Sequence, residues 1–223
     1  MAASGQPPYK VIARALAEQV ESGGFEPGEK LPSEAELQKR FGGVSRDTIR
    51  AAIGELARFG LTVSQSTVGT FVRTYERVPV LLAVVVAGGE VGEVDVRRAA
   101  PPGAVADLLP GVTSVWWRRS HHRGVVTDSY YPRDIGHLVP DLEEPAALAN
   151  PDILLARAGV NVVERRIRVL SRMPTMAEET LLGTPPGTPV EEVTAALIDS
   201  GGTGVAVRVV LLPGDRFVLE HTL

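Results

Sequence analysis

Two arginines four residues apart, Arg46 and Arg50, have a type and spacing that indicate a definite chemistry in this 223-residue chain. Residues with this separation lie on one face of a helix. A guanidinium group can donate two hydrogen bonds to O6 and N7 of guanine, a contact that discriminates between bases by about 1–3 kcal/mol. We therefore expect the pair to read base edges in duplex DNA, provided that a helix presents it.

A helix is predicted over the segment that contains the two arginines. Ser45 is placed to cap its N-terminus, and Ile49, Ile53 and Leu56 recur at the spacing of one buried face. The arginines then fall on the opposite, outward face.

Two further helices are predicted ahead of this one. The first spans residues 9–22, with apolar side chains at helical spacing, and ends at Gly23 and Gly24. The second begins at Ser33, and Glu36 stands three residues later at the capping-box position.

A turn and a β-hairpin complete the predicted unit. Gly42 and Gly43 break the chain between the second and third helices, and residues 61–72 alternate Thr, Val and Ser toward Gly69. Three helices followed by a two-stranded hairpin predict a winged helix-turn-helix. In that motif the second helix of the pair enters the major groove.

The charge of the chain favours nucleic-acid binding only locally. Residues 1–77 carry ten Lys and Arg against nine Asp and Glu, a net charge of +1, whereas residues 78–223 carry a net charge of −5. A basic footprint must come from clustered side chains. These are Lys39, Arg40, Arg46, Arg50, Arg58 and Arg73. The alternative is a small α/β domain with an ordinary solvated helix face.

Four segments of this region resemble the GntR family of bacterial transcription factors. They are Tyr9–Ile12, Pro27–Glu34, Val44–Arg50 and Gly69–Val72, and the resemblance covers about residues 8–72. It implies a DNA-binding protein of this class.

The same resemblance implies a set of DNA contacts. Arg46, Thr48 and Arg50 would contact the groove and the phosphates. Ser33 or Glu34 would anchor the start of the preceding helix at the DNA backbone. The complete candidate set is Ser33, Glu34, Lys39, Ser45, Arg46, Asp47, Thr48, Arg50, Gln65, Thr67 and Gly69.

Three positions depart from the family pattern. The turn has two glycines, Gly42 and Gly43, where the family usually has one, which favours a different tilt of the recognition helix. Ala35 replaces an Arg that touches phosphate in many members. The wing tip, residues 64–68, lacks the usual Arg and the extra Gly. Fewer cationic contacts predict lower affinity and a weaker dependence on salt.

A second domain is expected after a short charged link at residues 76–79. We expect domains at residues 1–73 and 80–223, with a linker over 74–79. The apolar run Val80–Ala87 is too short to span a bilayer and is interpreted as a buried strand. With no secretory leader and no Cys, the chain is expected to be cytoplasmic, and nucleoid-associated when bound to DNA.

Strand-like runs dominate the second domain. Residues 190–199 and 205–212 form a hairpin pattern, which predicts an antiparallel sheet with helices on one face. Helices are predicted at residues 153–158 and after Thr175, with Glu178 at the capping-box position. The predicted strands span residues 93–99, 114–121, 125–131, 160–171, 190–199, 205–212 and 216–222.

The second domain resembles the effector-binding domain called UTRA. The matching residues are Val126–Pro132, Pro174-Thr175, Glu178-Glu179, Leu182-Gly183, Gly187–Val190, Asp199 and Gly214–Phe217. The resemblance places the chain in the HutC-like subfamily and implies a fold like chorismate lyase, with a small-molecule pocket and a dimer interface. The expected fold class is α+β, a winged helix-turn-helix followed by an antiparallel-sheet α+β domain.

The resemblance also suggests where an effector would bind. In sugar-phosphate-sensing relatives paired Arg residues hold the ligand. Here Arg119 keeps one of them and Trp117 replaces the other, so a sugar phosphate is not expected. The candidates are Trp117, Arg119, Thr127, Asp128, Tyr130, Arg166, Arg168 and Glu220. The competing interpretation assigns residues 164–168 to a solvated strand face and the tryptophans to core or interface packing.

The sequence therefore predicts a homodimeric regulator that represses by binding a pseudo-palindromic operator in double-stranded DNA, until a small effector releases it. One alternative is a DNA-binding dimer whose C-terminal domain only dimerises or binds a protein. A lyase-like enzyme is a further alternative, disfavoured because the sequence has no Gly-x-Ser-x-Gly elbow, phosphate loop or metal-spaced His pair. No catalytic residue, metal or cofactor is expected.

Overall fold

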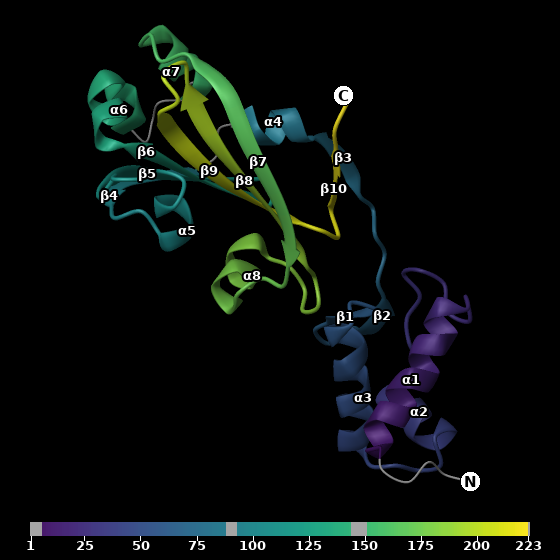
Figure 1. Cartoon of the computed structure of the whole chain (residues 1–223). Helices are drawn as coiled ribbons and strands as arrows, with labels where there is room; N and C mark the ends of the chain where they lie inside the picture. Colours follow the sequence, from purple (N-terminus) through teal and green to yellow (C-terminus); the bar gives the residue numbers. More distant parts are fainter. Residues whose placement is uncertain (1–5, 88–92, 144–150, 223) are drawn as a thin grey trace. The chain divides into compact units, whose positions relative to one another are not determined.

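The computed structural model describes residues 6–87, 93–143 and 151–222, which group into two compact units (Figure 1). Unit 1 comprises Met1–Glu76 with Thr184–Thr188, and unit 2 comprises Arg77–Gly183 with Pro189–Leu223. Among the described residues, every helix is too short or too polar to span a lipid bilayer.

Unit 1 is built from three helices and a β-hairpin, as the sequence predicts. Its elements are α1 (Pro8–Glu21), α2 (Glu34–Arg40), α3 (Arg46–Arg58), β1 (Thr62–Gln65) and β2 (Gly69–Val72). The two strands pair antiparallel. Leu16, Leu37, Ile49 and Leu56, drawn from all three helices, are almost completely buried in one core. This core fixes the position of α3 relative to α2.

Side-chain caps set the starts of α2 and α3. Ser33 Oγ accepts a hydrogen bond from the Glu36 backbone N–H, and the Glu36 carboxylate accepts one from the Ser33 N–H at 2.8 Å. Ser45 Oγ likewise accepts from the Thr48 N–H at 3.2 Å. Both predicted caps are confirmed, so the first turn of each helix is held by its own sequence.

The turn between α2 and α3 requires its two glycines. Gly42 and Gly43 both have φ of 75°, in the left-handed region where an L side chain is strained. The Gln38 amide closes the turn by donating to the Val44 carbonyl at 2.9 Å.

Unit 2 contains a six-stranded antiparallel sheet in the order β4-β5-β6-β9-β8-β7. The strands are β4 (Glu93–Ala99), β5 (Val115–His122), β6 (Val125–Pro132), β7 (Val162–Arg172), β8 (Val190–Asp199) and β9 (Gly204–Pro213). Six of the seven predicted runs occupy this sheet. The seventh forms β10 (Phe217–Glu220), which pairs in parallel with β3 (Val78–Leu81) outside it.

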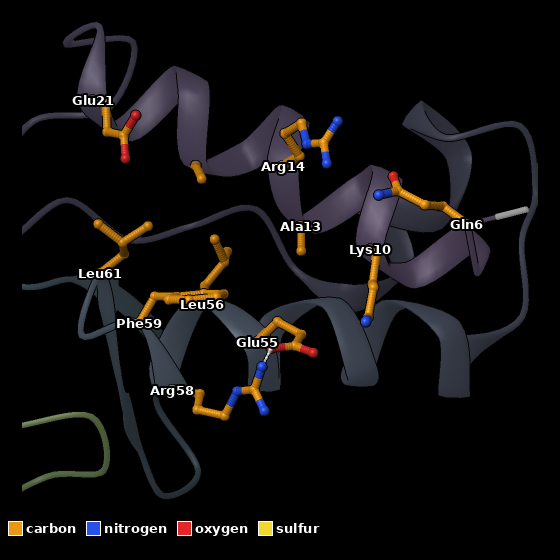
Figure 2. A pocket seen from close by; sticks show the side chains of 11 residues that line it. Gln6, Lys10, Ala13, Arg14, Glu21, Glu55, Leu56, Arg58, Phe59 and Leu61 are labelled. Carbon is orange, nitrogen blue, oxygen red and sulfur yellow. Dashed lines mark ion pairs between the residues drawn. The ribbon is translucent and has the colours of Figure 1, made fainter. Parts of the chain in front are cut away.

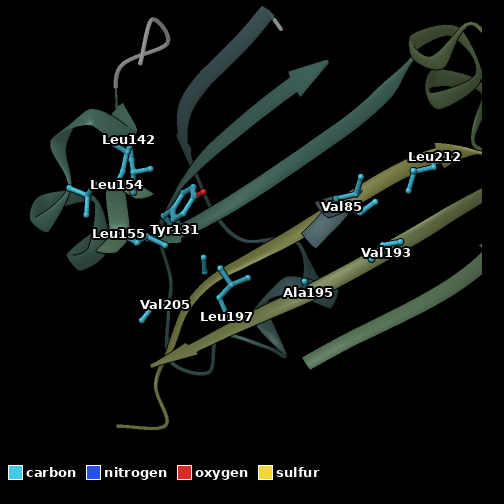
Figure 3. Close-up of a cluster of buried hydrophobic side chains, with 13 residues drawn as sticks. Val85, Tyr131, Leu142, Leu154, Leu155, Val193, Ala195, Leu197, Val205 and Leu212 are labelled. Atoms are coloured by element: carbon cyan, nitrogen blue, oxygen red, sulfur yellow. The ribbon is translucent and has the colours of Figure 1, made fainter. Parts of the chain in front are cut away.

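Helices cover both faces of this sheet, so the expectation of helices on one face was wrong. One face carries α4 (Leu82–Ala87), α6 (Arg133–Leu138), the 3-10 helix η1 (Pro140–Glu143) and α7 (Pro151–Arg157), around the core cluster in Figure 3. The other face packs against α5 (Gly103–Ala106) and α8 (Met176–Leu182). The reason is that β9 is buried along most of its length and on both sides, which one layer of helices cannot achieve.

The apolar run Val80–Ala87 is also not the buried strand that was expected. Its first two residues end β3, and the rest forms α4. Leu82 and Val85 pack against the core, whereas Val84 is exposed, a spacing of three that belongs to a helix. A short continuous apolar run does not distinguish the two structures by periodicity.

Candidate functional site

Arg46 and Arg50 lie on the outer face of the first turns of α3. Their side chains are 65% and 58% exposed, whereas Ile49 between them is fully buried. The buried residue orients the helix so that both guanidinium groups face solvent. The structure thus brings together the two residues on which the sequence argument depends.

A single carboxylate joins these arginines. Glu34, the first residue of α2, accepts a hydrogen bond from Arg50 Nε at 3.0 Å through Oε1, and its Oε2 accepts from Arg46 Nε. The Arg46 guanidinium, followed by that of Arg50, holds the pKa of the Glu34 carboxyl below its ordinary value. Glu34 is therefore ionised at neutral pH and pairs with both side chains.

The other candidates on α2 and α3 divide into caps and exposed groups. The hydroxyls of Ser33 and Ser45 bond the first turns, and the Thr48 hydroxyl lies 2.8 Å from that of Ser45. Lys39 and Asp47 are exposed. Eight of the eleven candidates therefore lie on α2, on α3 or at their caps, and contacts join Glu34 to the two arginines and Ser45 to Thr48.

The remaining three candidates, Gln65, Thr67 and Gly69, lie in the wing hairpin. Thr67 has φ of 63° at its tip, in the left-handed region that favours a Gly. Lys30, which sequence reasoning missed, forms a bridge with Phe71 and passes its side chain over Gly69. A lysine thus lies beside the Arg-poor wing. No local sequence signal predicts this, because the pairing joins residues 41 positions apart.

A groove between α1 and α3 is the other feature of unit 1 (Figure 2). It encloses about 500 Å³ and is lined by Ala13, Leu56 and Leu61, with Glu55 and Arg58 paired at 2.8 Å along one side. It involves the C-terminal half of α3, away from the turn that carries Arg46. It therefore plays no part in presenting the two arginines.

Four of the predicted effector residues form one cluster in unit 2. Arg119 donates two hydrogen bonds of 2.7 Å to the carboxylate of Asp128, and its guanidinium lies 5.0 Å from the ring centre of Trp117. Tyr130 faces Trp117 across the strands, and burial raises the pKa of its hydroxyl to about 12. These polar groups bond one another, which is typical of a packed cluster.

The other four predicted effector residues lie apart from this cluster. Thr127 alternates onto the opposite face of β6. Arg166 and Arg168 lie on the exposed edge strand β7, where Glu164 pairs with Arg166 at 2.6 Å. Glu220 belongs to β10, outside the main sheet. The eight candidates therefore do not form one site.

Two buried arginines on the opposite sheet face were missed. Arg118 and Arg208 lie in one row across β5, β6 and β9, with Ser129 between them. The Arg208 side chain is completely buried and donates to Asp152 Oδ1 at 2.6 Å. Arg118 donates to the Leu142 carbonyl at 2.6 Å, and burial lowers its pKa. The sequence does carry a signal for the position of Arg118. Adjacent residues of a strand face opposite sides of the sheet, so Arg118 must lie on the face opposite Trp117.

This row of cations lies under α7 and η1, which supply Asp152 and the Leu142 carbonyl. The Trp116 indole packs on the same face against Gly136 of α6, and its buried Nε1 has no hydrogen-bond partner among the described residues. The described ranges contain no group of three or more His, Cys, Asp or Glu side chains that could hold a metal ion.

The fold and the exposed arginine pair define a winged helix-turn-helix protein with a second, sheet-rich α+β unit. The family model described as bacterial regulatory proteins, gntR family, matches residues 8–72. Residues 8–72, which form the three helices and the wing hairpin, therefore resemble the domain that defines this family.

Curated relatives agree with this assignment. The chain is 46% identical over 66 residues to the histidine utilization repressor of Klebsiella aerogenes, a match that covers 30% of this chain and 27% of that protein. It is 28% identical over 229 residues to the HTH-type transcriptional regulator Rv0792c of Mycobacterium tuberculosis, covering 95% and 84%.

A solved structure extends the likeness of fold to the whole chain. A crystal structure assigned to a GntR-family transcriptional regulator is 22% identical and has a TM-score of 0.64, covering 98% of each chain. The arrangement of a helix-turn-helix domain and an antiparallel α+β domain is thus shared with a protein of this family.

Proposed function

We propose that this chain is a transcriptional regulator that binds operator DNA through α3 and represses the genes it controls. The observation that carries the proposal is the pair of exposed arginines, Arg46 and Arg50, on the outward face of α3. This helix is capped by Ser45, and its inner face is buried in the core of unit 1. The repressor named among the relatives supports the repressing mode. The protein would act in the cytoplasm, at the nucleoid when bound to DNA.

A gel-shift titration at fixed salt tests this function. The full chain would first select a sequence from a library of random duplexes. Arg46→Ala and Arg50→Ala are then expected to weaken binding of the selected duplex by about tenfold or more, since each removes one base contact. Unchanged affinity in both variants would refute the assignment of the recognition helix.

We further propose a homodimer, which a pseudo-palindromic operator requires. Support comes from β7, an eleven-residue edge strand. Val163, Ile167 and Val169 on this strand are at least 40% exposed. A long edge strand presents unpaired backbone groups to which a strand of another chain can pair, and these exposed apolar side chains would be buried by that pairing. Sedimentation velocity of Val169→Lys should show monomer, whereas Val84→Lys on α4 should remain dimeric.

We propose that residues 1–73 form the DNA-binding domain, residues 74–79 the linker, and residues 80–223 the domain that binds the effector. We place the effector site on the face that carries Arg118 and Arg208, in place of the predicted cluster around Arg119. In that predicted cluster, Arg119 is the one cation kept from the paired Arg residues of the sugar-phosphate-sensing relatives, and the Asp128 carboxylate pairs with it. Two buried cations on the other face support an anionic effector, including phosphorylated ones.

Thermal-shift screening of the full chain tests the effector part. Phosphorylated sugars, carboxylates and uncharged metabolites form three arms, and the proposal expects stabilisation by an anion that Arg118→Gln abolishes. An absence of stabilisation in every arm would favour the alternative, a DNA-binding dimer whose C-terminal domain only dimerises or binds a protein.

A further inference from the structure

The Glu34 carboxylate holds both arginines of the recognition helix before any DNA is present. It accepts from the Nε of Arg46 and from the Nε of Arg50, so one side chain of α2 fixes two side chains of α3. The Glu34 side chain is 29% exposed, about half the exposure of its partners. The contact therefore crosses the helix-turn-helix at the surface proposed to meet DNA.

Both sides of this contact are anchored. Glu34 follows Ser33, whose capping box fixes the start of α2, and Leu37 one turn later is fully buried. The arginines flank Ile49, which is fully buried in the same core, on a helix capped by Ser45. The carboxylate and the two guanidinium groups are therefore brought together by the backbone of the motif.

Two physical effects follow for DNA binding. Bonding at Nε restrains the long side chains, and it leaves the Nη groups at the outer end to donate to a base. The negative charge also lowers the net charge of the three groups from +2 to +1, and it faces the phosphates of an approaching duplex. Phosphate attraction provides sequence-independent affinity, whereas base contacts provide discrimination.

We infer that Glu34 is a positioning residue that sets sequence specificity, because it orients Arg46 and Arg50 toward bases and suppresses their non-specific use on phosphates. This inference rests on the proposed DNA-binding function. It assigns to Glu34 a role through the arginines, in place of the anchoring contact to the DNA backbone that the family resemblance implied.

Glu34→Gln is the direct perturbation. The variant keeps one acceptor oxygen but presents an amide donor to the second guanidinium group, so one arginine loses its partner, and the charge of the surface rises by one. The probes are the duplex selected by the full wild-type chain and a scrambled duplex of the same length and composition. Affinity for each is measured by fluorescence anisotropy between 50 and 300 mM salt, concentrations of the order over which such affinities change strongly.

The expected result has two parts. Binding of the scrambled duplex becomes tighter, and the slope of log affinity against log salt steepens by about 0.9, the value for one additional phosphate contact. The ratio of affinities for the selected and scrambled duplexes falls by about tenfold, the order of one base contact. A merely structural role would weaken both duplexes together and leave the slope unchanged.

Control variants separate charge from position. Glu18→Gln removes the same charge from an exposed site on α1, and should leave the specificity ratio unchanged. Glu34→Asp keeps the charge but shortens the reach, so the ratio should fall without a steeper slope. In the double variant Glu34→Gln and Arg46→Ala, the ratio of affinities should fall by less than the two single losses combined. The reason is that Glu34 acts through Arg46. Circular dichroism confirms that each variant is folded.

The failures are distinguishable. If the wild-type chain selects no sequence, the proposed function and this inference are both overturned. If it selects one, and Glu34→Gln and Glu34→Asp both match Glu18→Gln in specificity ratio, the inference alone is overturned.

Discussion

Breaking the ion pair between Asp152 and Arg208 should destabilise unit 2 strongly. The Arg208 side chain is completely buried, and Asp152 is only 18% exposed. Removing one partner of a buried pair costs about 3–5 kcal/mol, because the remaining charge stays in a medium of low dielectric constant. Asp152→Asn keeps an acceptor oxygen and Arg208 also contacts the Tyr131 hydroxyl at 3.5 Å. We therefore expect the lower end of that range, about 3 kcal/mol.

The two tryptophans allow this loss to be measured in unit 2 alone. Trp116 and Trp117 are the only tryptophans of the chain and both lie in β5. Urea unfolding followed by tryptophan fluorescence should show a midpoint well below that of the wild type. In a thermal scan, about 3 kcal/mol corresponds to roughly 6–12 °C for a chain of this size.

An exposed pair provides the matched control for this prediction. Glu164→Gln breaks the contact between Glu164 and Arg166, whose side chains are 49% and 70% exposed, and should leave the urea midpoint almost unchanged. Equal and small losses for Asp152→Asn and Glu164→Gln would refute the reasoning that burial makes Arg208 dependent on its carboxylate.

Three further predictions concern the turn, the wing and an ion pair near α8. Gly43→Ala should destabilise unit 1 by about 1–2 kcal/mol because of its φ of 75°, whereas Gly54→Ala within α3 should stabilise it by about 1 kcal/mol; urea unfolding followed by circular dichroism compares the two. Thr67→Gly should stabilise unit 1 by about 1 kcal/mol, since a β-branched residue at φ of 63° is strained, and an unchanged or lower midpoint would contradict this. The Arg172 guanidinium lowers the pKa of Glu178 from 4.5 to about 2, so its contribution is complete above pH 4.5 and is lost as the pH falls toward 2. The stability advantage of wild type over Glu178→Gln, about 1 kcal/mol after allowance for solvent screening, should be present at pH 6 and shrink below pH 4; a constant difference in urea midpoint would contradict the assignment.

Features encoded within a few residues were predictable from the sequence. The caps at Ser33, Ser45 and Thr175 and the wing hairpin depend on local hydrogen bonds and turn preferences, and the structure confirms them. Arg46 and Arg50 were identified because residues four positions apart on a helix lie on the same face. The apolar residues of α3 fix the inner face, so the arginines must lie on the outer one.

Features that depend on contacts distant in sequence were not predictable. The helical state of Leu82–Ala87 is decided by packing of Val85 in the core of unit 2. The parallel pairing of β3 with β10 joins residues about 139 positions apart. In both cases the local sequence allows either outcome, and tertiary contacts select one.

The eight predicted effector residues are not gathered in one place for a related reason. Arg119 and Asp128 were chosen as polar residues on a strand, but the sequence does not reveal that they bond each other across β5 and β6. Arg118 was passed over, although alternation places it on the opposite face. The row that Arg118 shares with Arg208 depends on the register of β5, β6 and β9, which the sequence does not reveal.

The central claim, that α3 reads base edges through Arg46 and Arg50, is tested most directly on a modified duplex. Replacing guanine by 7-deazaguanine in one half-site of the selected sequence removes the N7 acceptor and leaves the phosphates intact. The wild type should bind this duplex about tenfold more weakly, whereas a variant that lacks the contacting arginine, Arg46→Ala or Arg50→Ala, should not respond to the replacement at that base. Arg14→Ala on α1 should behave like the wild type. An equal loss of affinity in all of these proteins, or no loss in the wild type, would contradict the claim.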